Sequence, residues 1–144
     1  MLDDNGVEID HDFLSFFLEE SIVVMGNLKK FLKLFIENED PKNFEQFGQQ
    51  VDRLMGAAYT LSLNFFGELS KMGKEIGYKS SQLNEIEKLL VIHSLLSQLV
   101  KTLNAILKQY KKDLNPDTSE FHPLLERLQE ANRNLGNLRA TVKG

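Results

Sequence analysis

The apolar residues of this chain recur in steps of three and four along almost its whole length. The most regular series is Leu89, Ile92, Leu96, Leu99, Leu103, Ile106 and Tyr110. Because an α-helix turns once in about 3.6 residues, this spacing places the apolar side chains on one face of a helix. Strand-like segments that alternate apolar and polar residues are absent from the sequence. The pattern therefore predicts an all-α fold.

Capping residues mark the first two helices. Asp10 or Asp12 is suited to cap a first helix that ends at 38–40. Pro41, which follows an aspartate, is suited to the first position of a second helix. We expect that helix to run to about Leu63.

Three further helices are expected. A short third helix follows a break near residues 62–64, and Gly77 is expected to be its C-cap. Ser80 or Ser81 is expected to cap the fourth helix, which Asn115-Pro116-Asp117 breaks. A fifth amphipathic helix is expected over Phe121–Val142.

The first helix has more apolar residues than one face needs. Its main stripe is Leu14, Phe17, Ser21, Val24, Leu28, Phe31 and Phe35. The residues that widen this stripe are Phe13, Phe16, Ile22, Val23, Leu32 and Ile36. We therefore expect this helix to be buried on more than one side.

The arrangement that buries these faces is an antiparallel four-helix bundle with an additional C-terminal helix. The chain has 144 residues, of which 42% are apolar, so it can fill a sizeable core. We expect the bundle to span residues 1–114. Residues 115–144 would form the C-terminal amphipathic helix, packed on the bundle or extending from it.

Composition excludes several classes of function. The chain has no cysteine, which excludes thiolate metal sites and disulfides and suits a reducing, cytoplasmic setting. Its net charge of −4 disfavours nucleic-acid binding, which needs a basic surface. No apolar run approaches the roughly 18 residues of a membrane span. A bundle metal site needs Glu-x-x-His pairs on facing helices, and the sequence has a single such pair, Glu8 and His11, in its leading segment. We expect neither a metal nor another cofactor.

The three histidines offer little chemistry. His93 projects at the margin of the apolar face of the fourth helix, where it is either a half-buried side chain or a phosphoacceptor. His122 precedes a proline at a helix start, which favours a capping or loop role. His11 lies in the leading segment and is expected to be solvated.

Asp52 has an unusual setting in the second helix. Its neighbours one turn away are Gly48 and Gly56, and Met55 and Tyr59 follow on the same side. Two interior glycines cost a helix roughly 1 kcal/mol each relative to alanine. Either they leave the carboxylate open to another protein, or they permit close contact between helices and Asp52 is an ordinary surface charge.

The segment Asp52-Arg53-Leu54-Met55-Gly56-Ala57 resembles the His-x-Leu-Lys-Gly-Ser/Ala signature of histidine phosphotransfer (HPt) domains. The phosphotransfer domains of chemotaxis-type histidine kinases are the most similar. Phe16-Phe17-Leu18-Glu19-Glu20 is similar to the family's first long helix, and Phe66, Leu69 and Met72 continue as its next helix does. The resemblance covers roughly residues 10–112.

The differences from the family matter for mechanism. Asp52 stands where the family has its phosphoryl-accepting histidine, and Met55 stands where it has a lysine. Ser62 replaces a glycine that the family often has. A carboxylate cannot supply the imidazole nitrogen that phosphohistidine chemistry needs, so the resemblance implies the shape of an HPt domain without its catalysis.

Three hypotheses follow. In the first, the chain is a non-catalytic signalling module of two-component or chemotaxis type. Its partner would be a receiver or histidine-kinase domain, bound through Gly48, Asp52, Met55, Gly56 and Tyr59. In the second, it is an active phosphotransfer protein that uses His93. In the third, it is an adaptor that forms homodimers through the helix at Phe121–Val142.

Overall fold

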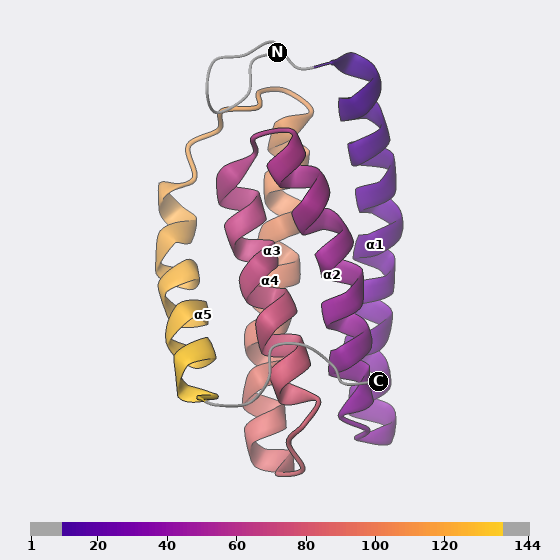
Figure 1. Cartoon of the computed structure of the whole chain (residues 1–144), viewed down its shortest axis with the longest axis vertical. Coiled ribbons are helices and arrows are strands. Elements are labelled where there is room, and N and C mark those ends of the chain that lie inside the picture. The colour runs from indigo at the N-terminus through magenta and orange to yellow at the C-terminus, as the bar shows by residue number, and fades with distance from the viewer. Residues whose placement is uncertain (1–9, 137–144) are drawn as a thin grey trace.

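The structure is a computed structural model that describes residues 10–136, and it is a helical bundle (Figure 1). Its helices are α1 (His11–Asn38), α2 (Lys42–Thr60), α3 (Asn64–Ser80), α4 (Ile86–Tyr110) and α5 (His122–Asn134). A 3₁₀ turn, η1 (Ser119–Phe121), leads into α5. The described residues contain no strand, so the predicted all-α class is confirmed.

Short connections place each of the first four helices beside the next one along the chain. Helix α2 packs between α1 and α3, and α4 closes the arrangement by contacting both α1 and α3. Helix α5 packs on α3 at the edge of the molecule opposite α1 (Figure 1). Leu124 and Leu128 of α5 are buried and join the same core as the other helices. Helix α5 therefore folds back on its own chain, and it ends at Asn134, earlier than the expected Val142, which lies outside the described residues.

The ends of the first two helices are as expected. The Asp10 carboxylate accepts hydrogen bonds from the backbone N–H groups of Asp12 at 2.8 Å and Phe13 at 3.3 Å, which makes it the N-cap of α1. Glu39 ends that helix in the left-handed region, at φ 55°. The Asp40 carboxylate then accepts from the N–H of Lys42 at 3.0 Å.

The turn between α2 and α3 is the break predicted near residues 62–64. Ser62 takes φ 57°, and its N–H donates to the carbonyl of Tyr59 at 3.0 Å. This reversal lays α3 antiparallel against α2. The turn thereby determines which residues of α2 lie opposite which residues of α3.

Two predicted caps are wrong. Gly77 does not end α3; it is buried inside the helix, which continues to Ser80. The fourth helix begins later than expected, with Glu85 at its N-cap position and no side-chain cap. The Ser81 hydroxyl instead donates back to the carbonyl of Tyr78 at 2.6 Å. Gly77 is needed for contact between helices and not for a change of backbone direction.

Helix α4 supplies the centre of the core. All seven residues of its predicted seam, Leu89 to Tyr110, are buried. Among the described residues it is also the one helix long and apolar enough to cross a membrane. The expectation from sequence rested on the absence of an unbroken apolar run, and it did not anticipate a helix of this length and composition. The central helix of a water-soluble bundle has the same length and composition, and the seam of α4 packs inside this bundle.

The prediction that α1 is buried on more than one side is wrong. The main stripe faces the core, but five large apolar side chains lie half or more exposed: Phe13, Phe16, Ile22, Val23 and Ile36. One exposed residue between the two halves of the helix is Gly26, which has no other atom within 4 Å of the place where a Cβ would be. Such a glycine costs roughly 1 kcal/mol of helix stability, and it permits no close contact with another of the described helices.

Helices α2 and α3 approach most closely at two glycines. A Cβ on Gly77 would lie 2.7 Å from the backbone oxygen of Phe44 and 3.1 Å from the backbone nitrogen of Gly48. Both obstacles are backbone atoms, so a side chain here forces the helices apart. The contact requires glycine on one helix directly against the backbone of the other.

We predict that Gly77→Ala lowers the free energy of unfolding by about 1–3 kcal/mol, because overpacking outweighs the gain in helix propensity. The matched control is Gly56→Ala, since Gly56 lies in α2 with open space around it and alanine there is expected to stabilise by about 0.5–1 kcal/mol. Urea unfolding followed by circular dichroism measures both changes. Equal effects of the two substitutions would contradict the close contact.

Candidate functional site

Asp52 lies in the middle of α2 on the side that faces outward and toward α3. Its side chain is 44% exposed, while Val51 and Leu54 beside it are fully buried in the core. The motif segment is therefore oriented as predicted, with its leucine inward and its acidic residue at the surface. The half-exposed carboxylate of Asp52 is therefore the centre of the candidate site.

A lysine from the next helix accompanies Asp52. The ammonium Nζ of Lys74 in α3 lies 3.4 Å from a carboxylate oxygen of Asp52, and its side chain is 26% exposed. Met55, one turn along α2 from Asp52, supplies no charge. Positive charge nevertheless lies beside the acidic residue, because α3 supplies it from outside the motif. Sequence reasoning missed Lys74, which lies in another helix.

Gly48 does not leave open space beside Asp52, and this part of the prediction is wrong. Gly48 is buried, and a Cβ on it would lie 2.8 Å from two ring atoms of Tyr78. The glycine is needed so that the tyrosine of α3 can lie across α2. Of the two explanations for the glycines, close contact between helices is therefore the correct one at Gly48. Gly48 lies beneath the surface on which Asp52 is exposed.

The other predicted site residues do lie at the surface. Gly56 is exposed with open space around it, and Met55 is half-buried. Tyr59 is 40% exposed, and its ring lies across Gly67 of α3, where a Cβ would meet a ring carbon at 2.8 Å. We define the α2–α3 surface as Asp52, Met55, Gly56, Tyr59 and Lys74.

Two tyrosine phenols border this surface, and both are held in the neutral form. Burial raises the pKa of Tyr78, and the carboxylates of Asp52 and Glu45 raise it further. Burial also raises the pKa of Tyr59, with added contributions from Glu68 and Glu75. Proton loss from Tyr78 would place a second negative charge against Asp52. Both phenols remain protonated hydrogen-bonding groups at neutral pH.

The side chain of His93 is partly buried and is hydrogen-bonded to another helix. Its Nε2 lies 2.9 Å from the backbone carbonyl of Leu32 in α1. Because a carbonyl only accepts, Nε2 is the donor in this hydrogen bond. The ring also stacks on Phe35 with 6.0 Å between centroids. These contacts describe a half-buried histidine that joins α4 to α1.

The other two histidines lie far from Asp52 in the fold. His122 is the first residue of α5, and its ring stacks on that of Phe65 at 4.9 Å between centroids. It therefore helps to hold α5 on α3, in addition to its place at a helix start. His11 is exposed at the beginning of α1, as expected. The structure brings no histidine into the α2–α3 surface.

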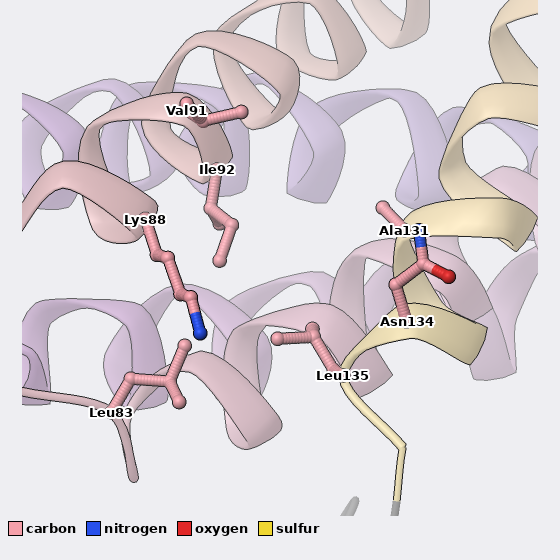
Figure 2. A pocket seen from close by; sticks show the side chains of 7 residues that line it. All are labelled: Leu83, Lys88, Val91, Ile92, Ala131, Asn134 and Leu135. Atoms are coloured by element: carbon pink, nitrogen blue, oxygen red, sulfur yellow. The ribbon is translucent and has the colours of Figure 1, made fainter. Parts of the chain in front are cut away.

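A shallow groove runs between α4 and α5 and is the main concave feature outside that surface. One part of it has a volume of about 400 Å³, and Figure 2 shows the residues that line this part: Leu83, Lys88, Val91, Ile92, Ala131, Asn134 and Leu135. The lining is mainly apolar, and Lys88 is paired with Glu85 at 3.3 Å. The groove contains no acid, base and nucleophile in contact with one another. Among the described residues, no group of three or more His, Cys, Asp or Glu side chains could hold a metal ion.

Comparison of the chain with protein-family models, with curated protein sequences and with solved structures finds no match in any of the three. The function of the α2–α3 surface therefore has to be inferred from its own residues.

The tyrosines give this site a predicted pH dependence. A folded-state pKa raised above the ordinary value of 10.0 means that folding favours the protonated phenol. That stabilisation is fully present below pH 10.0 and is lost as the pH rises through the folded-state pKa. We expect the free energy of unfolding to fall above that pH, and Asp52→Asn to lower the pKa of Tyr78. NMR titration of the tyrosine ring carbons measures the second effect, and Tyr59, whose pKa is raised by burial, Glu68 and Glu75, is the internal control.

We also predict that His93→Ala lowers the free energy of unfolding by about 1–3 kcal/mol, because it removes a part-buried hydrogen bond and a ring contact. His11→Ala, at an exposed helix end, is the control and is expected to change nothing measurable. Thermal and urea unfolding compare the two variants. A stability of His93→Ala equal to that of the parent would contradict the role of His93 between α1 and α4.

Proposed function

We propose that this chain is a non-catalytic signalling module of HPt-like shape that binds a receiver or kinase domain through the α2–α3 surface. In this proposal α1 to α4 form the four-helix bundle of that family, and α5 is the additional helix. The observation that carries the proposal is the exposed Asp52 in the middle of α2, at the position of the family's phosphoacceptor, with Lys74 beside it.

Energetics support a role in binding for these two charges. A surface ion pair such as Asp52–Lys74 contributes about 0–1 kcal/mol to stability, so the fold gains little from it. Charges at such positions guide association and select partners by complementarity. The fixed carboxylate presents negative charge where an HPt domain presents histidine or phosphohistidine, and the ammonium group offers a partner carboxylate its counter-charge.

The neighbouring side chains suit protein contact. Met55 is adaptable and apolar, and Tyr59 combines an apolar ring with a protonated hydroxyl. Gly56 adds no side chain, so the backbone of another protein can approach the helix there. Together these residues provide an apolar contact next to a charged pair. The proposed setting is the cytoplasm, in agreement with a chain that has no cysteine.

Active phosphotransfer by the same surface has no observation in its favour. The surface carries a carboxylate where the chemistry needs an imidazole. The alternative acceptor, His93, has Nε2 in a hydrogen bond with Leu32 and its ring against Phe35. Incubation with an active histidine kinase and labelled ATP is the direct test. Acid-labile label that disappears in His93→Ala would replace the binding proposal with an enzymatic one.

Binding is tested by titrating the ¹⁵N-labelled full chain with receiver domains and kinase domains of its source organism. We expect amide shifts centred on Asp52, Gly56 and Tyr59. Asp52→Arg is expected to weaken binding at least about tenfold. The substitution replaces the negative charge that the partner is proposed to recognise with a positive charge, at the centre of the surface. Its matched control is Glu126→Arg, which makes the same charge change at an exposed position of α5.

Two outcomes would overturn the proposal. One is the absence of any shift on the α2–α3 surface with every receiver and kinase domain titrated. The other is equal weakening by Asp52→Arg and Glu126→Arg, which would show a response to net charge alone. Asp52→Arg is expected to remain folded, because Asp52 is half-exposed and its ion pair contributes little to stability.

A further inference from the structure

The outward side of α1 combines apolar residues with separated charges. Phe16, Glu19, Val23, Gly26 and Lys30 follow one another in steps of three and four, so they form one line along the helix. All five are exposed, with Phe16 at 64% and Val23 at 57%. We call this line the outer seam. Figure 1 shows α1 at the edge of the bundle, with α5 at the opposite edge.

The seam has the pattern of a helix–helix interface, and none of the helices that the structure describes lies on it. A spacing of three and four residues is what two packed helices share, and here the inner stripe of α1 already fills that role for the core. Phe13 and Ile22 are exposed beside the seam and widen its apolar part. Large exposed apolar side chains gathered on one element mark a surface that another molecule covers.

Charge shows which molecule fits. The first half of α1 exposes Asp12 and Glu19, and the second half exposes Lys29, Lys30 and Lys33, of which Lys33 is paired with Glu37 at 4.0 Å. When two α1 helices lie antiparallel with their midpoints together, Glu19 of each copy faces Lys30 of the other. A parallel pair would instead place Glu19 against Glu19 and Lys30 against Lys30, which is repulsive. The seam is therefore complementary to a second copy of itself in the antiparallel direction.

The same arrangement accounts for Gly26. With the helix midpoints together, Val23 of each copy lies opposite Gly26 of the other, on both sides of a two-fold axis. A residue without a side chain lets the valine approach the backbone of the facing helix closely. Among residues 10–136, no atom outside the adjoining backbone of α1 comes within 4 Å of a Cβ at this position, so packing within the described residues gives no reason for glycine here.

We propose that the outer seam of α1 is the interface of a two-fold symmetric homodimer, with two antiparallel α1 helices crossing at Val23 and Gly26. Helix α1 has 28 residues and is about 42 Å long at 1.5 Å per residue, so most of its length is available for the contact. None of the α2–α3 surface residues belongs to the seam. The dimer is therefore independent of the proposed partner binding, and either can fail without the other.

The first experiment measures the mass of the full chain by sedimentation equilibrium over a range of concentrations. We expect twice the chain mass of 16.5 kDa at high concentration, with reversible dissociation on dilution. Gly26→Arg is expected to weaken dimerisation at least about tenfold, since a large charged side chain blocks the crossing. Gly56→Arg is the matched control, because it makes the same change at an exposed, open helix position in α2.

The second experiment tests direction and register. Glu19→Lys and Lys30→Glu, made singly, are each expected to weaken the dimer about tenfold, and the double variant is expected to recover most of the loss. Circular dichroism shows that each variant is folded. Recovery in the double variant requires the two positions to face each other across the interface, which a general effect of charge on solubility would not produce.

Three results would overturn the inference. A chain that stays monomeric at the highest soluble concentration has no such interface. A Gly26→Arg chain that dimerises like the parent uses another surface, for example the groove between α4 and α5. A double charge variant that is weaker than both single variants excludes the antiparallel register.

Discussion

The close approach of α2 and α3 at Gly48 and Gly77 determines the geometry of the candidate site. The two helices come this close only because both positions lack a side chain, since a Cβ on Gly77 would lie 2.7 Å from the backbone oxygen of Phe44. The antiparallel register fixed in this way brings Lys74 beside Asp52 and places the ring of Tyr59 over Gly67. The ion pair and the ring contact follow from the glycine contact, and the ion pair alone is too weak to set it.

Much of the fold was predictable because helical burial leaves a periodic record in sequence. The core seam of α4 and the cap at Asp10 depend on neighbours within one or two turns, which a sequence displays directly. The errors concern contacts between distant segments. Gly77 has the sequence position of a helix C-cap, but its conformation is set by the carbonyl of Phe44 on another helix. Spacing within α3 contains no information about that carbonyl.

The candidate site shows the same division. The exposure of Asp52 and the burial of Leu54 follow from helical angles alone, and both were predicted. Lys74 was not predicted, because it lies in α3 and becomes a neighbour only once the turn at Ser62 reverses the chain. The turn itself was expected, so pairing residues at equal distances on its two sides would have placed Asp52 near Lys74. Gly48 was misjudged for a related reason, since nothing within α2 indicates that Tyr78 lies across it.

The exposed apolar residues of α1 show a different kind of error, in which a periodic pattern predicts burial that the bundle does not provide. The sequence has apolar residues on both sides of the helix, and burial within one chain is the simplest explanation for them. The bundle covers only the inner stripe, because α2 and α4 leave the outward side free. A pattern of apolar residues records all the surfaces that are covered in the working state of a protein, including those covered by other molecules. For α1 the surplus residues, the uncovered Gly26 and the opposite charges at its two halves have one physical explanation in a second copy of the chain.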